Sequence, residues 1–172
     1  MRRPSSISLF ALLIVTFSPG CRVIDSEDEA EVALFAYASA SCAPWDGPAL
    51  DLVLTTREQS CANIEHVTYG DGPALDFTRL VIYGINEPES GRSWTIDLDE
   101  DGGLTPASAG WGQRCPGNEQ SCAPIDRATV AFTPAGDDAF TIMTTILYPD
   151  GSEDTTRRNV CVCPRPSFPL CG

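Results

Sequence analysis

The chain has 172 residues, of which 24 are acidic and 11 basic, and its formal net charge is −13. A chain of this length forms one domain with a buried core, and its composition is that of a globular protein. The negative charge argues against a nucleic-acid-binding face and against direct docking on anionic lipid headgroups. All the basic residues are arginines, which excludes Schiff bases, P-loop lysines and Ser–Lys dyads.

Residues 1–20 have the features of a secretory signal peptide. Arg2 and Arg3 precede an uncharged apolar run from Ile7 to Phe17, and small residues follow it. The run is too short for a membrane-spanning helix, which needs about 20 apolar residues. We therefore expect an exported protein, in a compartment where cysteines oxidise to disulfides.

The end of the signal resembles the lipobox of bacterial lipoproteins, in which the new N-terminal cysteine receives lipid. The resemblance covers the first 21 residues and departs from the usual pattern at Ser18 and Pro19. It implies acyl chains on Cys21 that hold the protein in a bilayer. Because Arg22 carries no inner-membrane retention signal, it also implies the outer membrane, on its periplasmic or its cell-surface face. The alternative is ordinary signal cleavage, with Cys21 free to join a disulfide.

Residues 21–31 form the expected lipidated cysteine and an acidic tether. Five of the seven residues from Asp25 to Glu31 are acidic, so this segment repels itself and stays extended. Residues 32–172 are then expected to form a single β domain.

Apolar residues in the domain alternate with a period of two, which is typical of half-buried strands. Asp150-Gly151 supplies a tight hairpin turn and Gly136-Asp137-Asp138 a second one, whereas Glu100 to Ile125 reads as a long irregular connection. The pattern predicts an antiparallel β-sandwich of seven or eight strands, stabilised by disulfides, with an up-and-down β-barrel as the alternative. The expected strands are 32–40, 49–56, 75–84, 93–99, 127–133, 140–148 and 155–163, with 64–69 as a further candidate.

Seven cysteines lie in the expected domain and are disulfide candidates. Cys115 and Cys122 bracket a short loop, so they are the easiest pair to propose. Cys161 and Cys163 share one face of the last expected strand, so each should reach a separate partner. Lipidation of Cys21 would leave an odd number of cysteines and one of them unpaired. The candidates are Cys42, Cys61, Cys115, Cys122, Cys161, Cys163 and Cys171, and Cys42 and Cys61 are expected to pair with members of the C-terminal trio.

An acidic stretch resembles the start of an EF-hand calcium loop. Asp97, Asp99 and Asp101 occupy positions 1, 3 and 5, and Gly102 occupies position 6. Position 12, normally a bidentate Glu, is Ser108, and the flanking segments do not read as helices. Calcium is therefore the one cofactor candidate. The alternative is that the first two carboxylates are the charged solvent side of an edge strand.

Trp111 is the candidate for ligand stacking. It lies between glycines in the long connection, near acidic residues and Asn118, as an exposed aromatic on a sugar-binding face would. The alternative is that its ring folds back over the end of the sheet as a plug.

No sequence motif for catalysis stands out. His66 is the only histidine, and it lacks the G-x-S-x-G, H-E-x-x-H or Cys–His context of a catalytic residue. The signal, the SCAP-x-D turns and the terminal Cys171-Gly172 resemble the small, disulfide-bearing, lysine-free lipoproteins of myxobacteria. We expect an envelope-anchored lipoprotein that acts as a non-enzymatic binding or structural module for an unknown protein or polysaccharide. A calcium- or carbohydrate-binding module is the alternative, and a hydrolase with an unrecognised carboxylate pair is a remote one.

Overall fold

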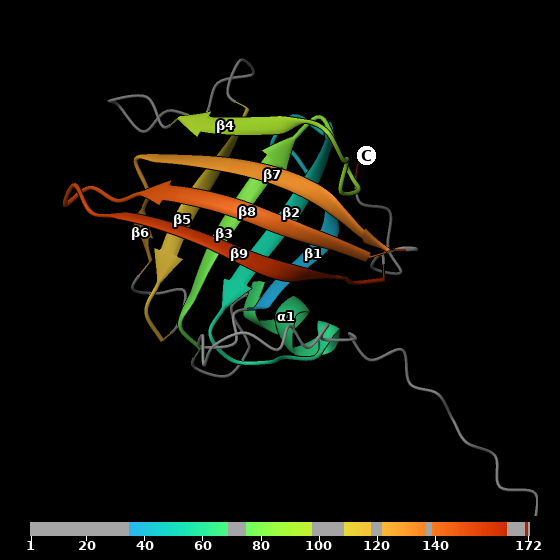
Figure 1. Ribbon diagram of the computed structural model, residues 1–172, viewed down its shortest axis with the longest axis horizontal. Coiled ribbons are helices and arrows are strands. Elements are labelled where there is room, and N and C mark those ends of the chain that lie inside the picture. Colours follow the sequence, from blue (N-terminus) through green and yellow to red (C-terminus); the bar gives the residue numbers. More distant parts are fainter. Residues whose placement is uncertain are drawn as a thin grey trace, which may run out of the picture.

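The computed structural model describes residues 35–68, 75–97, 109–117, 122–136, 139–164 and 171. This part of the chain forms nine strands and one short helix (Figure 1). In chain order they are β1 (Phe35–Cys42), β2 (Pro48–Thr55), α1 (Cys61–Thr68), β3 (Phe77–Tyr83), β4 (Ser93–Asp97), β5 (Gly110–Cys115), β6 (Ala123–Pro124), β7 (Arg127–Gly136), β8 (Ala139–Leu147) and β9 (Glu153–Val162).

The nine described strands belong to one sheet, in the order β4-β7-β8-β9-β1-β2-β3-β5-β6. In Figure 1, β7, β8 and β9 cross over β1, β2, β3 and β5, so the two halves of the sheet face each other as two layers. The sheet is not closed into a barrel, since β4 and β6 are its edges. The prediction of an all-β, disulfide-bearing fold is confirmed, with two layers that are halves of one folded sheet.

One strand pair departs from the antiparallel pattern. β9 runs antiparallel to β8 but parallel to β1, with Val160 opposite Ala36. The first and last described strands therefore meet in the middle of the sheet and join its two halves. A parallel pair requires a long connection, and here nearly the whole domain lies between the two strands.

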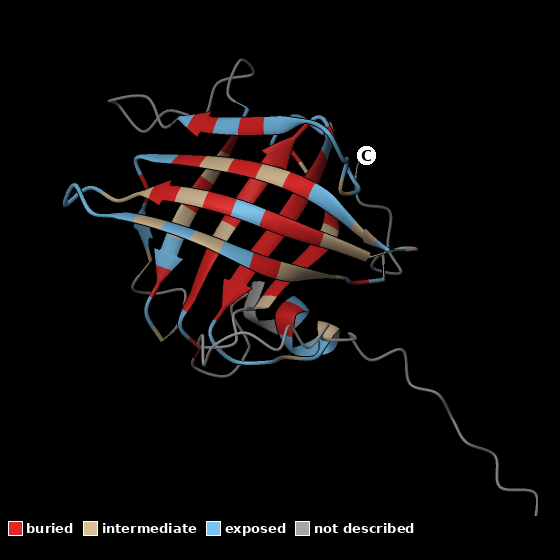
Figure 2. Ribbon diagram, viewed as in Figure 1, coloured by how far each residue is buried: buried red, intermediate tan, exposed pale blue. Residues whose placement is uncertain are grey.

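The main core lies between the two layers. Buried residues alternate along β7 (Figure 2), and two of them, Val130 and Phe132, belong to the same core cluster as Leu52 and Ile82 from the other half. Trp94 of β4 is buried, as the alternation predicts, and its ring lies edge-on to Phe132 at a centroid distance of 5.6 Å. Burial of these apolar side chains is the main force that folds the sheet over itself.

The outer face of β1, β2 and β3 is also largely buried (Figure 2). A second cluster there includes Tyr37, Val53 and Phe77, and α1 covers it with Ile64. The hydroxyl of Tyr37 accepts a hydrogen bond from the backbone N–H of Gln59 at 2.5 Å. β2 is consequently buried on both faces, which the strict alternation of a half-exposed strand does not predict.

The sequence makes 64–69 a further strand candidate, and this prediction is wrong, because Ile64 to Thr68 belong to α1. Ser60 is the N-cap of the helix. Its hydroxyl accepts a hydrogen bond from the backbone N–H of Asn63 at 3.1 Å, and its carbonyl accepts one from Ile64 at 3.0 Å. Capping satisfies backbone donors that otherwise lack partners, which favours a short helix despite a strand-like sequence.

The expected irregular connection contains two strands, β5 and β6. The sequence did not predict β5 because the strand contains glycines, and glycine is depleted in strands. The structure gives them a packing role: a Cβ on Gly112 would lie 2.5 Å from Ile125 and 2.8 Å from Leu80. Only a residue without a side chain allows β5 to approach the core this closely.

The predicted hairpin turn between β8 and β9 is confirmed. The backbone N–H of Tyr148 donates to the carbonyl of Ser152 at 2.9 Å, and Gly151 has a φ of 80°. Such a φ favours glycine. The other predicted turn starts at Gly136, which pairs with Ala139, and residues 137–138 lie outside the described residues.

Candidate functional site

Trp111 lies on the outer face of the sheet, on β5, where Arg79 of β3 packs against it. The guanidinium carbon of Arg79 is 5.1 Å from the centroid of the indole ring. The ring is half-buried and rests against a small cluster that includes Val81 and Tyr83. Trp111 therefore lies on a strand of the folded sheet, where one neighbour is a cation that aromatic faces attract.

An ion pair holds Arg79 in this position. Arg79 Nε donates to both carboxylate oxygens of Asp51, at 3.1 and 3.0 Å, and its Nη2 lies 2.6 Å from Asp51 Oδ2. Asp51 is only 2% exposed, although it lies on the outer face of the sheet. The two residues occupy the same face of neighbouring strands β2 and β3. The pair fixes the plane of the guanidinium, because both hydrogen-bonding partners are planar forks.

Two further aromatic rings lie on the same side. Trp45 belongs to the turn between β1 and β2, and its ring meets Tyr83 of β3 edge-on at a centroid distance of 4.7 Å. The turn is closed by a hydrogen bond from the N–H of Ala43 to the carbonyl of Gly47, at 2.9 Å. Trp45 is 40% exposed, so the turn presents an aromatic surface to solvent.

The hydroxyl of Tyr83 is buried and has no hydrogen-bond partner among the described residues. Burial raises the pKa of this phenol above its usual value of 10.0, so the group stays protonated at neutral pH. It is thus a buried, protonated donor beside the ring of Trp45. We call Trp45, Tyr83 and Trp111, with Arg79 and Asp51, the aromatic patch.

The aromatic patch combines apolar rings with fixed polar groups, which is the composition of a surface that binds by stacking and hydrogen bonding. Sequence reasoning found only Trp111. Asp51 and Arg79 alternate with apolar residues in β2 and β3, a pattern that indicates solvent-facing positions. No local signal shows that these two positions face each other on a covered face.

The calcium candidates are only partly described. Asp97 ends β4 and accepts a hydrogen bond from Arg127 Nε, directly opposite it on β7. Both side chains are more than half exposed, and this hydrogen bond raises the pKa of Arg127. Asp99 and Asp101 lie outside the described residues, as do Ser108 and Asn118. Calcium binding stays a prediction, and its one described carboxylate already has a cationic partner.

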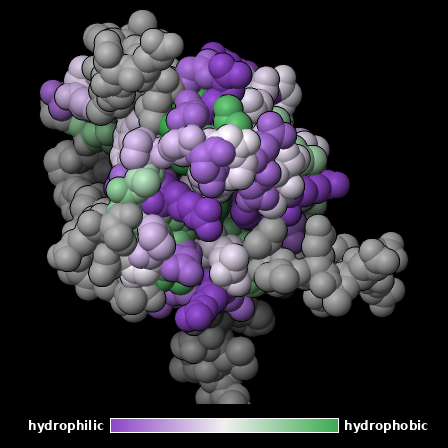
Figure 3. Space-filling view, turned by 90° about the vertical axis from the view of Figure 1, so that its left-hand side faces the viewer, coloured by the Kyte–Doolittle hydropathy of each residue, from purple (hydrophilic) through white to green (hydrophobic). Residues whose placement is uncertain are grey.

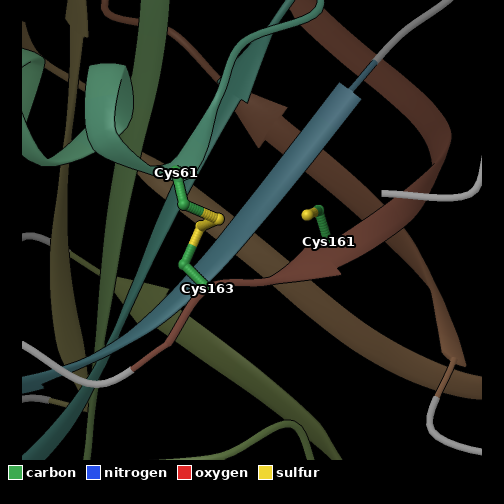
Figure 4. Close-up of side chains that lie close together, drawn as sticks. All are labelled: Cys61, Cys161 and Cys163. Carbon is green, nitrogen blue, oxygen red and sulfur yellow. A yellow bond between two sulfur atoms is a disulfide. The ribbon is translucent and has the colours of Figure 1, made fainter. Parts of the chain in front are cut away.

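The predicted pair Cys115–Cys122 forms a disulfide. The expectation that Cys42 and Cys61 pair with C-terminal cysteines is confirmed by the bonds Cys42–Cys171 and Cys61–Cys163. Figure 4 shows the second of these beside Cys161, and the three sulfur atoms of this group lie within 4.8 Å of one another. Cys161 is itself disulfide-bonded, and no described cysteine is free. These bonds and the disulfide of Cys161 account for every described cysteine, which makes a thiolate zinc site at this cluster incompatible with the oxidised protein.

The remaining predicted residues fall outside what the structure describes. Cys21 lies in residues 1–34, which are outside the described part of the chain. His66 lies in α1, but its side chain is not among those that the structure describes. Figure 3 shows the side of the molecule that lies at the left of Figure 1. The described surface there carries mainly hydrophilic side chains, with small apolar areas between them.

The chain matches no model of a known family, no curated protein and no solved structure. Within the described residues, no helix has the length and apolarity needed to cross a membrane. The residues of the aromatic patch are therefore the basis for a functional assignment.

Proposed function

We propose that this protein is an exported, non-enzymatic binding module of the bacterial outer envelope, and that it binds a polysaccharide through the aromatic patch. One observation carries the proposal: Asp51 holds Arg79 against the ring of Trp111, beside Trp45 and Tyr83. Sugar rings have apolar faces that stack on aromatic side chains and hydroxyls that bond to fixed polar groups. On one face, the patch offers the exposed ring of Trp45 for the first kind of contact and the partly exposed guanidinium of Arg79 for the second.

The charge of the chain favours a neutral ligand. With a net charge of −13, the protein repels anionic polymers over a Debye length of about 8 Å at physiological ionic strength. Within the patch, the charge of Arg79 is balanced by Asp51. A neutral polysaccharide avoids the long-range repulsion and still finds hydrogen-bonding groups.

Binding is tested by electrophoresis of the purified protein through native gels that contain dextran, hydroxyethylcellulose or xylan. We expect retardation in at least one gel, and we expect Trp111→Ala to weaken binding by about fivefold, since an aromatic contact is worth about 1 kcal/mol. Met143→Ala is the matched control, because Met143 is an exposed apolar residue of β8 in the other half of the sheet. Unchanged mobility in all gels, or equal loss in both variants, contradicts the proposal.

We further propose that acyl chains on Cys21 anchor the module, as the lipobox resemblance implies. The sulfur of Cys21 has a competing use. Three disulfides join six of the seven described cysteines, and Cys161 is bonded outside these three pairs. Cys21 is the eighth cysteine of the sequence, so a disulfide with Cys161 is the alternative to lipidation. A sulfur in a disulfide cannot carry a thioether lipid.

The intact mass of the protein from membranes of its native host decides between these fates. A mass of residues 21–172 plus acyl chains supports the anchor and counts the disulfides, since each bridge removes two hydrogens. An unlipidated mass with four bridges contradicts the anchor and makes the protein a freely diffusing secreted domain. The polysaccharide proposal is independent of either result, because the aromatic patch does not include Cys21.

A further inference from the structure

Arg158 is a buried cation between the two layers of the sheet. It lies on β9 directly opposite Ile142 of β8, a residue of the main core, so both side chains project into the same interior. Arg158 is 8% exposed. Arginine is almost never buried to this extent without a partner for its charge.

The hydrogen bonds of Arg158 are incomplete. Nη1 donates to the hydroxyl of Thr144 at 3.0 Å, whereas Nε is buried and has no acceptor among the described residues. A guanidinium has five N–H donors in a rigid fork. Thr144 also lies 3.1 Å from the hydroxyl of Thr156, so it belongs to a small polar cluster inside the sheet.

The charge of Arg158 is not neutralised by contact. Among the described residues, no carboxylate lies within ion-pair distance of it, and Asp154 attracts it only at longer range. Burial outweighs that attraction and lowers the pKa of Arg158. A buried charge is costly unless it is paired, so this site favours an anion that supplies the missing acceptors.

A second arginine lies near the same end of the interior. The guanidinium carbon of Arg114, on β5 in the facing layer, is 5.2 Å from the ring centroid of Tyr148, which packs against the main core. Arg114 is exposed. Figure 3 shows the molecule from the side on which β8 ends and β9 begins. Arg114 therefore places a second, exposed cation beside Tyr148, just beyond the end of β8.

We propose that Arg158 is an anion-binding residue that holds the carboxylate of a monocarboxylic acid between the layers, beside Thr144 and Tyr148. A carboxylate has two acceptor oxygens in a plane, which fits the fork that includes the unpaired Nε. A monoanion is favoured over phosphate or sulfate for two reasons. Each additional charge raises the cost of leaving water for a site lined by Ile142 and Val160, and a chain of charge −13 repels a dianion more strongly.

The test measures the thermal unfolding of the full-length exported protein in sodium acetate, sodium phosphate and sodium chloride at equal ionic strength and pH 7. A ligand that binds only the folded state stabilises it in proportion to the logarithm of its concentration. We expect acetate to raise the Tm by about 5 °C or more at 100 times its dissociation constant, relative to chloride. A larger shift with phosphate than with acetate overturns the choice of a monocarboxylate.

Two variants separate binding at Arg158 from general salt effects. Arg158→Met removes the cation and should abolish the acetate shift. Arg157→Met, on the adjacent exposed position of β9, should keep it. In chloride, Arg158→Met should unfold at the same temperature as the unaltered protein or higher, because an unpaired buried charge is removed. An acetate shift that survives in Arg158→Met overturns the proposal.

A spectroscopic readout does not depend on stability. The 15Nε–1Hε resonance of Arg158, assigned by its loss in Arg158→Met, should move on addition of acetate and saturate. Resonances of Arg157 should not move. If the Arg158 signal is unaffected at acetate concentrations that shift the Tm, acetate binds elsewhere and Arg158 is not the site.

Discussion

At the scale of single residues, the contact between Asp51 and Arg79 shows how burial changes the contribution of an ion pair to stability. The carboxylate is almost inaccessible and Arg79 is 15% exposed, so solvent screens the pair poorly. Asp97 and Arg127 form the same kind of contact at an edge of the sheet, with both side chains more than half exposed. Exposed pairs contribute little because water screens them, whereas loss of one partner from a buried pair leaves an uncompensated charge.

Asp51→Asn is therefore predicted to lower the free energy of unfolding by about 3 kcal/mol or more, because Arg79 keeps its charge in a covered site. Urea unfolding monitored by tryptophan fluorescence measures this change. Asp97→Asn is the matched control and should have a much smaller effect. Similar losses in the two variants would show that the Asp51 site is better solvated than its burial indicates.

At the scale of elements, β9 contributes residues to the core, to the proposed anion site and to the disulfides. Its inner face carries Arg158 and Val160 toward the core, while its outer face carries Cys161 toward the second cluster. Beyond its end, Cys163 bonds Cys61 of α1 and so ties the helix to the outer face of the sheet. One strand thus contributes to the core, to the proposed anion site and to the disulfide framework, because its two faces alternate.

The disulfides should differ in their contribution to stability according to the chain they close. Cys42–Cys171 spans a sequence separation of 129, whereas Cys115–Cys122 spans 7. On the loop-entropy model, removing the long bridge costs about 5 kcal/mol and removing the short one about 2 kcal/mol.

This difference is measured by urea unfolding of two double variants, Cys42→Ala/Cys171→Ala and Cys115→Ala/Cys122→Ala, each of which keeps the other bridges. The first should lose the larger free energy of unfolding. Equal losses, or a larger loss for the short bridge, would mean that native packing around the cystines outweighs the entropy of the unfolded chain.

At the scale of the whole molecule, the excess of acidic residues opposes the compact state. With 24 acidic and 11 basic residues, folding brings like charges together, and salt screens their repulsion. We predict that raising NaCl from about 10 mM to about 200 mM raises the Tm by about 2 °C or more. Choline chloride at the same ionic strength should act equally, which distinguishes screening from sodium binding. A fall in Tm would show that attractive ion pairs dominate the surface.

Sequence alone determined the all-β class, the disulfide-rich character and the turn at Asp150-Gly151. These properties depend on local chemistry: a period of two, the number of cysteines and the glycine that a positive φ requires. The pairing of Cys115 with Cys122 was predictable for the same reason, since only 7 positions separate them. The glycines of β5 misled the same reasoning, because their role depends on Leu80 and Ile125 from other parts of the chain.

Tertiary structure alone decided which strands are neighbours and which polar residues are covered. Alternation shows that Asp51, Arg79 and Arg158 share a face with certain neighbours in their own strands, but not what covers that face. The cover comes from distant segments: β1 and β9 meet across the domain, and α1 closes part of the outer face. Both the aromatic patch and the buried Arg158 arise from these long-range contacts, because burial is a property of the folded sheet and not of a strand's own sequence.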